Sequence, residues 1–237
     1  MKISVCMATY NGEQYIREQI DSILIQLGEF DELIISDDGS TDDTKEIINS
    51  FFDSRIIFLS NESESGVVGN FTNALKYSTG DVIFLSDQDD VWLDNRISIV
   101  LNHLKNHDAV VMNCKTTDQN LNVIEHSYFD FNNSKKGFFN NLYKSSYLGC
   151  CLAFNKNVLD YSLPIPNNLL MFHDWWFGIM IELKFDVFFE KKPLLLYRRH
   201  MSTSSQTGNT SNRSLYLKLY SRLQLIIYAF LHYFRKD

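Results

Sequence analysis

The sequence has few positively charged residues and few cysteines. Each of these shortages excludes a class of protein. Its 22 Lys and Arg residues stand against 29 Asp and Glu residues, which gives a net charge of −7. A general nucleic-acid-binding protein needs a basic face to displace the counterions around phosphates. We therefore expect no nucleic acid as a partner, and any phosphate-bearing partner should bind at one local site.

The four cysteines do not form a zinc motif. Cys6, Cys114, Cys150 and Cys151 lack the paired spacing of zinc ligands, and three of them fall in apolar runs. We interpret them as reduced residues of the core. The first seven residues lead directly into a short apolar strand and leave no room for the apolar region of a signal peptide, which favours a cytoplasmic location.

Short apolar segments alternate with amphipathic segments through the first half of the chain. Strands are expected over 2–8, 33–36, 55–59 and 82–85, with helices between them. This alternation predicts an α/β domain with a doubly wound, mostly parallel sheet, right-handed crossovers and helices on both faces. Ser40 or Thr41 is expected to cap the helix that follows the second strand.

The loops that follow the first, second and fourth strands, 9–12, 37–41 and 87–90, are polar and should meet at the carboxyl edge of the sheet. The first of them lacks the Gly-x-Gly-x-x-Gly pattern with which a dinucleotide-binding dehydrogenase approaches a pyrophosphate, and the chain has no P-loop. A diphosphate bound at this edge would therefore need another counter-charge.

The third of these loops contains closely spaced carboxylates. If the backbone stays extended, Asp87 and Asp89 leave the strand on the same side, about 7 Å apart. Carboxylate oxygens so close to one another favour the binding of Mg²⁺ or Mn²⁺. The alternative is a solvated acidic loop that caps the next helix.

The second half of the chain is less regular. We expect helices over 93–107, 155–163 and from His173 to about Leu183, strands over 109–114, 149–154, 185–190 and 193–197, a hairpin over 116–127, and loop with short helix over 128–148. The polar segment 201–214 is expected to be a flexible loop. An amphipathic helix over 215–234 should pack on the domain or on a second subunit, or lie on a membrane surface.

Six segments match one family in order and spacing. They are 7–12 (Met-Ala-Thr-Tyr-Asn-Gly), 36–42 (Ser-Asp-Asp-Gly-Ser-Thr-Asp), 86–92 (Ser-Asp-Gln-Asp-Asp-Val-Trp), 148–150 (Leu-Gly-Cys), 173–176 (His-Asp-Trp-Trp) and 197–200 (Tyr-Arg-Arg-His). The chain resembles the family 2 glycosyltransferases, and within them the subgroup described as rhamnosyltransferase-like. The resemblance implies the GT-A, Rossmann-like fold over 1–200, with a nucleotide-sugar half (1–114) and an acceptor half (115–200), followed by 201–237 as loop and amphipathic helix.

The resemblance also implies roles for single residues. Asp174 would be the general base, and Asp87, Asp89 and His200 would hold the Mg²⁺ or Mn²⁺ ion. Residues expected to contact the nucleotide or substrate are Thr9, Tyr10, Asn11, Asp37, Asp38, Asn70, Asp87, Gly149, Trp175, Trp176 and Arg199. Taken without the resemblance, the two tryptophans fit an ordinary core and His200 fits the surface. The family often has Glu before the base, where this chain has His173.

The expected function is therefore an inverting, metal-dependent transfer of a sugar from a dTDP- or UDP-linked donor, with rhamnose as the sugar that the subgroup suggests. The acceptor would be a glycan or a lipid-linked acceptor in cell-surface polysaccharide synthesis, reached at the cytoplasmic face of the membrane. One rival is a sugar-nucleotide nucleotidyltransferase, although the first loop lacks the glycine-rich signature and lysine of that class. The other is a protein that binds nucleotide sugar without turnover.

Overall fold

A computed structural model describes residues 1–166, 168–200 and 214–236. Its strands are β1 (Ile3–Thr9), β2 (Glu32–Asp37), β3 (Ile56–Ser60), β4 (Val82–Ser86), β5 (Val91–Trp92), β6 (Ala109–Thr117), β7 (Val123–Glu125), β8 (Leu152–Asn155) and β9 (Val187–Arg198). Its α-helices are α1 (Ile16–Leu24), α2 (Thr44–Asn49), α3 (Val67–Lys76), α4 (Arg96–Leu104), α5 (Tyr128–Asn132), α6 (Phe138–Tyr143), α7 (Lys156–Ser162), α8 (His173–Lys184) and α9 (Leu215–Lys236).

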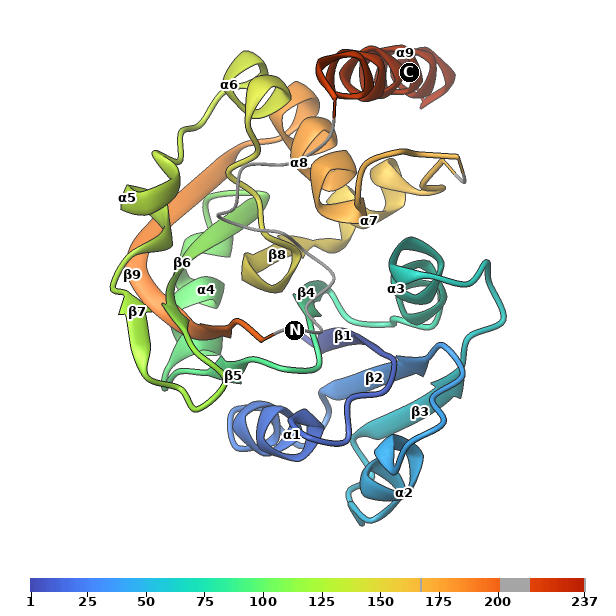
Figure 1. Ribbon diagram of the computed structural model, residues 1–237, viewed down its shortest axis with the longest axis vertical. Helices are drawn as coiled ribbons and strands as arrows, with labels where there is room; N and C mark the ends of the chain where they lie inside the picture. Colours follow the sequence, from blue (N-terminus) through green and yellow to red (C-terminus); the bar gives the residue numbers. More distant parts are fainter. Residues whose placement is uncertain (167, 201–213, 237) are drawn as a thin grey trace.

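The strands of the described residues form one curled sheet in the order β3-β2-β1-β4-β8-β6-β9-β5, and β7 pairs with β6 outside this order (Figure 1). β1, β2, β3, β4, β6 and β9 run in one direction, whereas β5, β7 and β8 run against them. The predicted α/β fold with a mostly parallel sheet is therefore confirmed.

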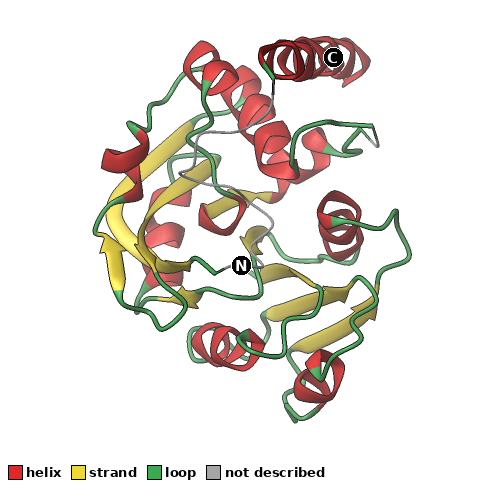
Figure 2. Cartoon of the chain, in the orientation of Figure 1, coloured by secondary structure: helices red, strands yellow, loops and turns green. Residues whose placement is uncertain are grey.

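Alternate residues of the central strands supply two separate cores. Val5 and Phe84 belong to the core on one face of the sheet, while their neighbours Cys6 and Ile83 belong to the core on the other. Residues of α1, α2 and α4 cover the first face, and residues of α3, α7 and α8 cover the second. Figure 2 shows these helices around the sheet, as expected for a doubly wound fold.

The order of the strands determines where a ligand can bind. From β1 the chain moves outward through β2 to β3, and it then returns to place β4 on the other side of β1. At such a reversal the two connections leave the sheet in opposite directions, so a crevice opens beyond the carboxyl ends of the strands. The loops 9–12 and 87–90 lie at this point.

Two predicted strand boundaries are wrong. The strands expected over 185–190 and 193–197 form one strand, β9, which contains a bulge. Met112 of β6 pairs with Glu190 and the next residue, Asn113, pairs with Pro193, so residues 191 and 192 are extra on β9. The strand expected over 149–154 begins later, because Gly149–Cys151 forms a 3-10 turn before β8.

The hairpin expected over 116–127 is confirmed by the pairing of β7 with β6. All four cysteines are buried and none forms a disulfide, as predicted. The loop expected over 201–214 lies outside the described residues except for Ser214.

The C-terminal helix α9 is present and packs on α8 at the edge of the molecule (Figure 1). Its buried side is narrow and consists of Ser221, Leu225 and Ala229. Polar contacts fix it further, since Arg222 donates to the carbonyl oxygens of Leu142 (3.1 Å) and Tyr143 (2.6 Å). No helix within the described ranges is long and apolar enough to cross a bilayer.

Candidate active site

A cavity of about 690 Å³ lies at the carboxyl edge of β1 and β4. Its wall combines the loop after β1, the acidic loop after β4, the start of α3, the turn before β8, the start of α8 and the end of β9. The predicted site residues in this wall are Thr9, Tyr10, Asn11, Asp38, Asn70, Asp87, Asp89, Gly149, Asp174 and His200. Residues far apart in sequence therefore meet in one pocket.

The loop after β1 is held by Gln88, which lies between the two aspartates of the acidic loop. The side-chain carbonyl of Gln88 accepts hydrogen bonds from the Thr9 hydroxyl (2.5 Å) and the Tyr10 N–H (2.9 Å), and its amide donates to the Tyr10 carbonyl (3.0 Å). A Cβ atom on Gly12 would lie 2.3 Å from Oε1 of Gln88. A side chain at position 12 would therefore displace the Gln88 amide from these contacts, and the two loops act as one unit.

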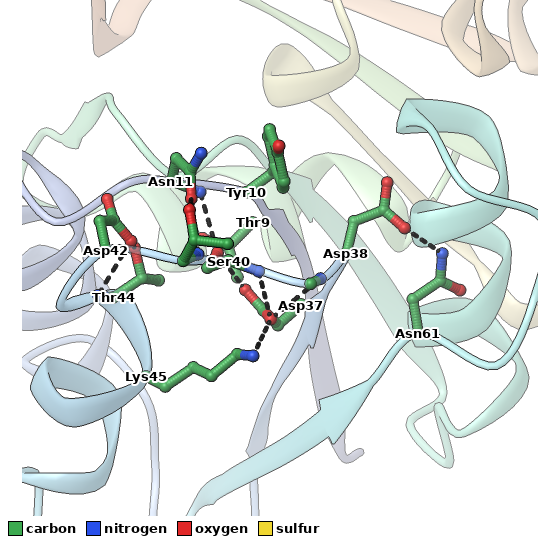
Figure 3. A network of polar contacts seen from close by, with 12 residues as sticks. Thr9, Tyr10, Asn11, Asp37, Asp38, Ser40, Asp42, Thr44, Lys45 and Asn61 are labelled. Atoms are coloured by element: carbon green, nitrogen blue, oxygen red, sulfur yellow. Dashed lines mark hydrogen bonds and ion pairs between the residues drawn. The ribbon is translucent and has the colours of Figure 1, made fainter.

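Asp37 shapes the second loop from within (Figure 3). Its carboxylate accepts from the N–H groups of Gly39 (3.1 Å) and Ser40 (2.9 Å) and from the Ser40 hydroxyl, and it lies 3.5 Å from the ammonium group of Lys45. Asp37 is 1% exposed and does not line the cavity. It therefore shapes the loop from a buried position, and the structure does not bring it into the cavity wall.

The prediction that Ser40 or Thr41 caps α2 is wrong, because both residues make their hydrogen bonds within and between the loops. Ser40 is used within the loop, since its hydroxyl oxygen accepts from the Asn11 N–H at 2.8 Å while it donates to Asp37. Thr41 instead donates its N–H to the side chain of Asn11 at 2.9 Å. α2 starts only at Thr44, whose N–H donates to the Asp42 carboxylate at 3.1 Å, while the residue just before the helix, Asp43, makes no capping hydrogen bond. The two residues thus join the first loop to the second.

Asp38 points to the opposite side of this loop, toward Asn61 (Figure 3). Its two oxygens accept from the Asn61 amide and from the Gly66 N–H just before α3, both at 2.7 Å. Asn70 of α3 donates to the Thr9 carbonyl at 3.0 Å, and its own carbonyl oxygen is buried without a hydrogen-bond partner in the described part of the chain. Both side chains line the cavity beside Thr9.

The acidic loop does not stay extended, because the backbone bends at Gln88 and Asp89. The condition of an extended backbone is therefore not met, although Asp87 and Asp89 still face the same cavity. Asp89 Oδ2 lies 2.7 Å from His200 Nε2. Burial, together with the negative charges of Asp89 and Asp174, raises the pKa of Asp87 to about 8.

This arrangement fits a divalent cation. The two carboxylates that face the cavity offer hard oxygen donors, and the imidazole of His200 adds a nitrogen donor beside them. The raised pKa of Asp87 indicates negative charge that the surrounding protein leaves uncompensated, which a bound cation would offset. Donor atoms of Asp87, Asp90 and Cys150 also lie within 4.8 Å of one another, although one oxygen of Asp90 already accepts from the Arg198 N–H at 3.0 Å.

Arg198 fixes the end of β9 against the acidic loop, a role that the sequence did not reveal. Its guanidinium donates to the Asp89 carbonyl (2.7 Å) and to Glu18 (2.5 Å), and it lies over the ring of Tyr15. The Tyr15 ring also contacts His200, with centroids 4.7 Å apart. Arg198 therefore helps to hold Asp89 and His200 together.

Asp174 lies in the first turn of α8 and faces the same cavity. It accepts a hydrogen bond from the Trp175 N–H at 2.8 Å, and the Gly149 N–H also donates to it. Burial outweighs these contacts and raises the pKa of Asp174 to about 7. A carboxyl group with that pKa can take up and release a proton near neutral pH.

Trp175, Trp176 and Arg199 are predicted site residues that the structure does not bring into the cavity wall. Trp176 is fully buried and its indole N–H donates to the Ser162 carbonyl at 2.8 Å, so its ring cannot stack on a bound sugar. Trp175 packs at the edge of the second core. Arg199 lines a separate cavity of about 60 Å³ next to β7.

The chain matches a known family and several known proteins. The family model "Glycosyl transferase family 2" matches residues 4–162. A dTDP-rhamnosyl transferase, RfbG of Shigella flexneri, is 30% identical over 233 residues, which cover 90% of this chain and 78% of that protein. The UDP-Glc:alpha-D-GlcNAc-diphosphoundecaprenol beta-1,3-glucosyltransferase WfgD of Escherichia coli is 32% identical over 172 residues, which cover 72% of this chain but 65% of that protein.

Among solved structures, S. aureus TarS 1-349 in complex with UDP-GlcNAc matches with a TM-score of 0.74 at 20% identity, over 96% of this chain and 67% of that one. At this identity the likeness concerns the fold, and it confirms the expected GT-A architecture. The family model covers more than half of the chain, and its range includes the first two loops and the acidic loop of the cavity wall. The chain belongs to glycosyl transferase family 2.

Proposed function

We propose that this protein transfers a sugar from a nucleotide-diphosphate sugar to a hydroxyl group of a glycan or lipid-linked acceptor, with inversion at the anomeric carbon, in cell-surface polysaccharide synthesis. One observation carries the proposal. One cavity is lined both by the proposed metal ligands, Asp87, Asp89 and His200, and by the carboxyl group of Asp174. A donor diphosphate and an acceptor hydroxyl would thus meet beside a proton acceptor.

The donor would bind in the half formed by 1–114. Thr9, Tyr10, Asn11, Asp38 and Asn70 line the part of the cavity next to β1 and α3, where base and ribose would lie. Asp37 acts on them through the loop that it shapes. We assign 115–200 as the acceptor half, since it supplies the turn before β8 and the start of α8.

Asp87, Asp89 and His200 would hold Mg²⁺ or Mn²⁺. Such an ion supplies positive charge that stabilises the departing diphosphate. The protein contributes the fixed positions of these ligands through Gln88 and Arg198. Asp174 would accept the proton of the acceptor hydroxyl, which requires its ionised form.

The donor can be identified with purified protein and a panel of dTDP- and UDP-sugars that includes dTDP-rhamnose and UDP-glucose. The first is suggested by the Shigella relative and the second by the E. coli relative. We expect one donor to raise the melting temperature with Mn²⁺ and to be hydrolysed slowly. A nucleotidyltransferase would instead release pyrophosphate from a nucleoside triphosphate and a sugar phosphate, and a pure binding protein would leave every donor intact.

We further propose that α9 rests on an anionic membrane surface. The helix contains Lys218, Arg222, Arg235 and Lys236 and no acidic residue, although the whole protein is acidic. Its outward side is apolar and aromatic, with Leu215, Tyr216, Leu219, Tyr220, Leu223, Ile227, Phe230, Leu231 and Phe234 all at least 46% exposed. This combination is typical of helices that lie in a membrane interface.

Replacing both Phe230 and Phe234 by serine should lower co-sedimentation with phosphatidylglycerol vesicles by at least about tenfold, because each ring contributes roughly 1.5–3 kcal/mol when it leaves water. The full chain should be used, since removing α9 would uncover the core around Leu225. Serine at Phe52, which is exposed on another surface, is the matched control. If the double variant alters oligomer size and leaves vesicle binding intact, the face is a subunit contact instead.

A further inference from the structure

His173, the first residue of α8, is buried in the cavity wall and has no role in the mechanism above. Its side chain is 4% exposed, and its ring stacks on Phe71 with centroids 4.0 Å apart. Neither ring nitrogen has a hydrogen-bond partner among residues 1–166, 168–200 and 214–236. A buried polar group without a partner costs roughly 1–3 kcal/mol, so such a group at a ligand site calls for an explanation.

The surroundings of His173 place it next to the proposed chemistry. The Nε2 atom faces Gly149, where a Cβ atom would come within 2.7 Å of it. The N–H of the same Gly149 donates to Asp174. Gly149, Phe71, His173 and Asp174 all line the cavity. The absence of a side chain at position 149 therefore leaves room for the imidazole directly beside the proposed base.

The chemistry of a neutral imidazole selects the kind of group that it can bind. Burial lowers the pKa of His173 to about 3, so the ring stays neutral at physiological pH. A neutral imidazole has one N–H donor and one acceptor nitrogen. A phosphate oxygen can only accept and is better served by a charged donor. A hydroxyl group both donates and accepts, which matches either ring nitrogen.

We propose that His173 hydrogen-bonds a sugar hydroxyl group of a bound substrate, next to Asp174, and thereby helps to determine which sugar is accepted. The inference rests on the proposed function, because it requires a sugar in this cavity. The hydroxyl could belong to the donor sugar or to the acceptor, and these two sources share the same chemistry. His173 is thus a specificity residue rather than a second base.

The test uses His173→Phe, which keeps a ring that can stack on Phe71 and removes both polar atoms, and His173→Gln, which keeps a donor and an acceptor. The control outside the cavity wall is His103→Phe, since His103 also stacks on a phenylalanine, Phe188. This variant loses in addition the contact of His103 with Glu190 at 2.8 Å, so it controls for substrate effects and not for stability. Calorimetry with Mn²⁺ compares UDP with UDP-glucose and dTDP with dTDP-rhamnose. Steady-state kinetics with the pair that binds then give kcat and KM for donor and acceptor.

If the hydroxyl belongs to the donor, His173→Phe should weaken binding of the nucleotide sugar about 10- to 100-fold and leave binding of the free nucleotide unchanged. If it belongs to the acceptor, donor affinity should persist and the acceptor KM should rise by a similar factor. In either case His173→Gln should recover part of the loss. A donor analogue that lacks the recognised hydroxyl should be insensitive to the substitution.

The proposal is overturned if His173→Phe changes donor affinity and acceptor KM by less than about twofold, or if it weakens nucleotide and nucleotide sugar equally. A lower melting temperature with unchanged substrate discrimination would likewise assign a purely structural role, such as contact with a buried water molecule. Failure of the wild-type protein to bind any nucleotide would instead contradict the proposed function itself. The two failures are therefore distinguishable.

Discussion

Replacing Asp174 with asparagine should lower sugar transfer by about 10²- to 10⁴-fold, the usual contribution of a general base. Asparagine has nearly the same shape but cannot accept the proton of the acceptor hydroxyl. Donor affinity should change little, because the residues proposed to bind the nucleotide and cation lie on other loops. The measurement is kcat and donor KM under saturating Mn²⁺, together with donor binding by calorimetry.

The same substitution tests the alternative that Asp174 only caps α8. The Trp175 N–H donates to its carboxylate, and asparagine caps helices about as well as aspartate. A capping role therefore predicts a nearly silent variant, and more than about half of wild-type transfer would contradict the assignment as base. Trp176→Phe is a suitable reference for core damage, because Trp176 lies two residues away in the same helix but outside the cavity.

The raised pKa of Asp174 adds a dependence on pH. Wild-type transfer should rise with pH up to the region of pH 7, where the carboxyl group ionises, and then level off. The stability of the folded protein should fall over the same pH range in which transfer rises. A carboxyl group whose pKa is higher in the folded than in the unfolded protein stabilises the fold at low pH, and this contribution is lost as pH rises through the folded-state pKa. Asp174→Asn should therefore gain melting temperature relative to wild type at pH 8 but not at pH 4.

The sequence was sufficient to predict the loops of the site because they follow strands with clear patterns. Continuous apolar runs predicted β1, β2 and β4, and the rule that parallel strands end at one edge brought Thr9, Asp38 and Asp87 together. The assignment of Asp174 as the base came from the family resemblance of segment 173–176. The structure places Asp174 in the cavity wall. Local patterns and edge topology thus carried most of the correct predictions.

The placements that the sequence did not reveal depend on properties that a linear pattern does not contain. Asp37 and Asp38 are adjacent and chemically identical, yet one turns into its loop and the other faces the cavity. Arg198 and Arg199 differ in the same way, because successive residues of a strand point in opposite directions. Knowing which of the two is buried requires the register of β9, which shifts twice against β6. Residues 191 and 192 are extra at the first shift, and one more residue is extra between Pro193 and Leu196 at the second. Only the shift by one residue exchanges the two faces of the strand.

Gln88 and Arg198 were missed for a related reason. Each acts by hydrogen-bonding backbone groups of a distant loop, and such contacts impose no pattern on the sequence near the residue itself. One signal was available for Gln88, namely its place between two aspartates that must both face the cavity. Gly12, which leaves room for the Gln88 side chain, is a second signal that becomes readable only once the two loops are known to touch.

Replacing Asp89 with alanine should abolish most of the divalent-dependent part of donor affinity. Asp89 faces the cavity together with Asp87 and contacts His200, so its loss removes one proposed ligand and frees another from its position. A single remaining carboxylate holds a small divalent cation poorly. We expect donor binding in Mn²⁺ to weaken by about 10- to 100-fold, the range found when metal-site support is removed, whereas binding in EDTA should stay close to that of wild type.

The sign of a second effect separates this role from simple damage to the loop. Without a cation, Asp89 raises the pKa of Asp87, so the two side chains repel each other. Asp89→Ala should therefore change the stability of the metal-free protein little, because relief of this repulsion offsets the lost contact with His200, and it should remove the increase in melting temperature on adding Mn²⁺. Asp94→Ala, which deletes an exposed carboxylate outside the cavity, controls for net charge. Equal, EDTA-insensitive donor binding by wild type and Asp89→Ala would show that this loop does not act through a metal, and the acidic residues would then serve only to shape the cavity.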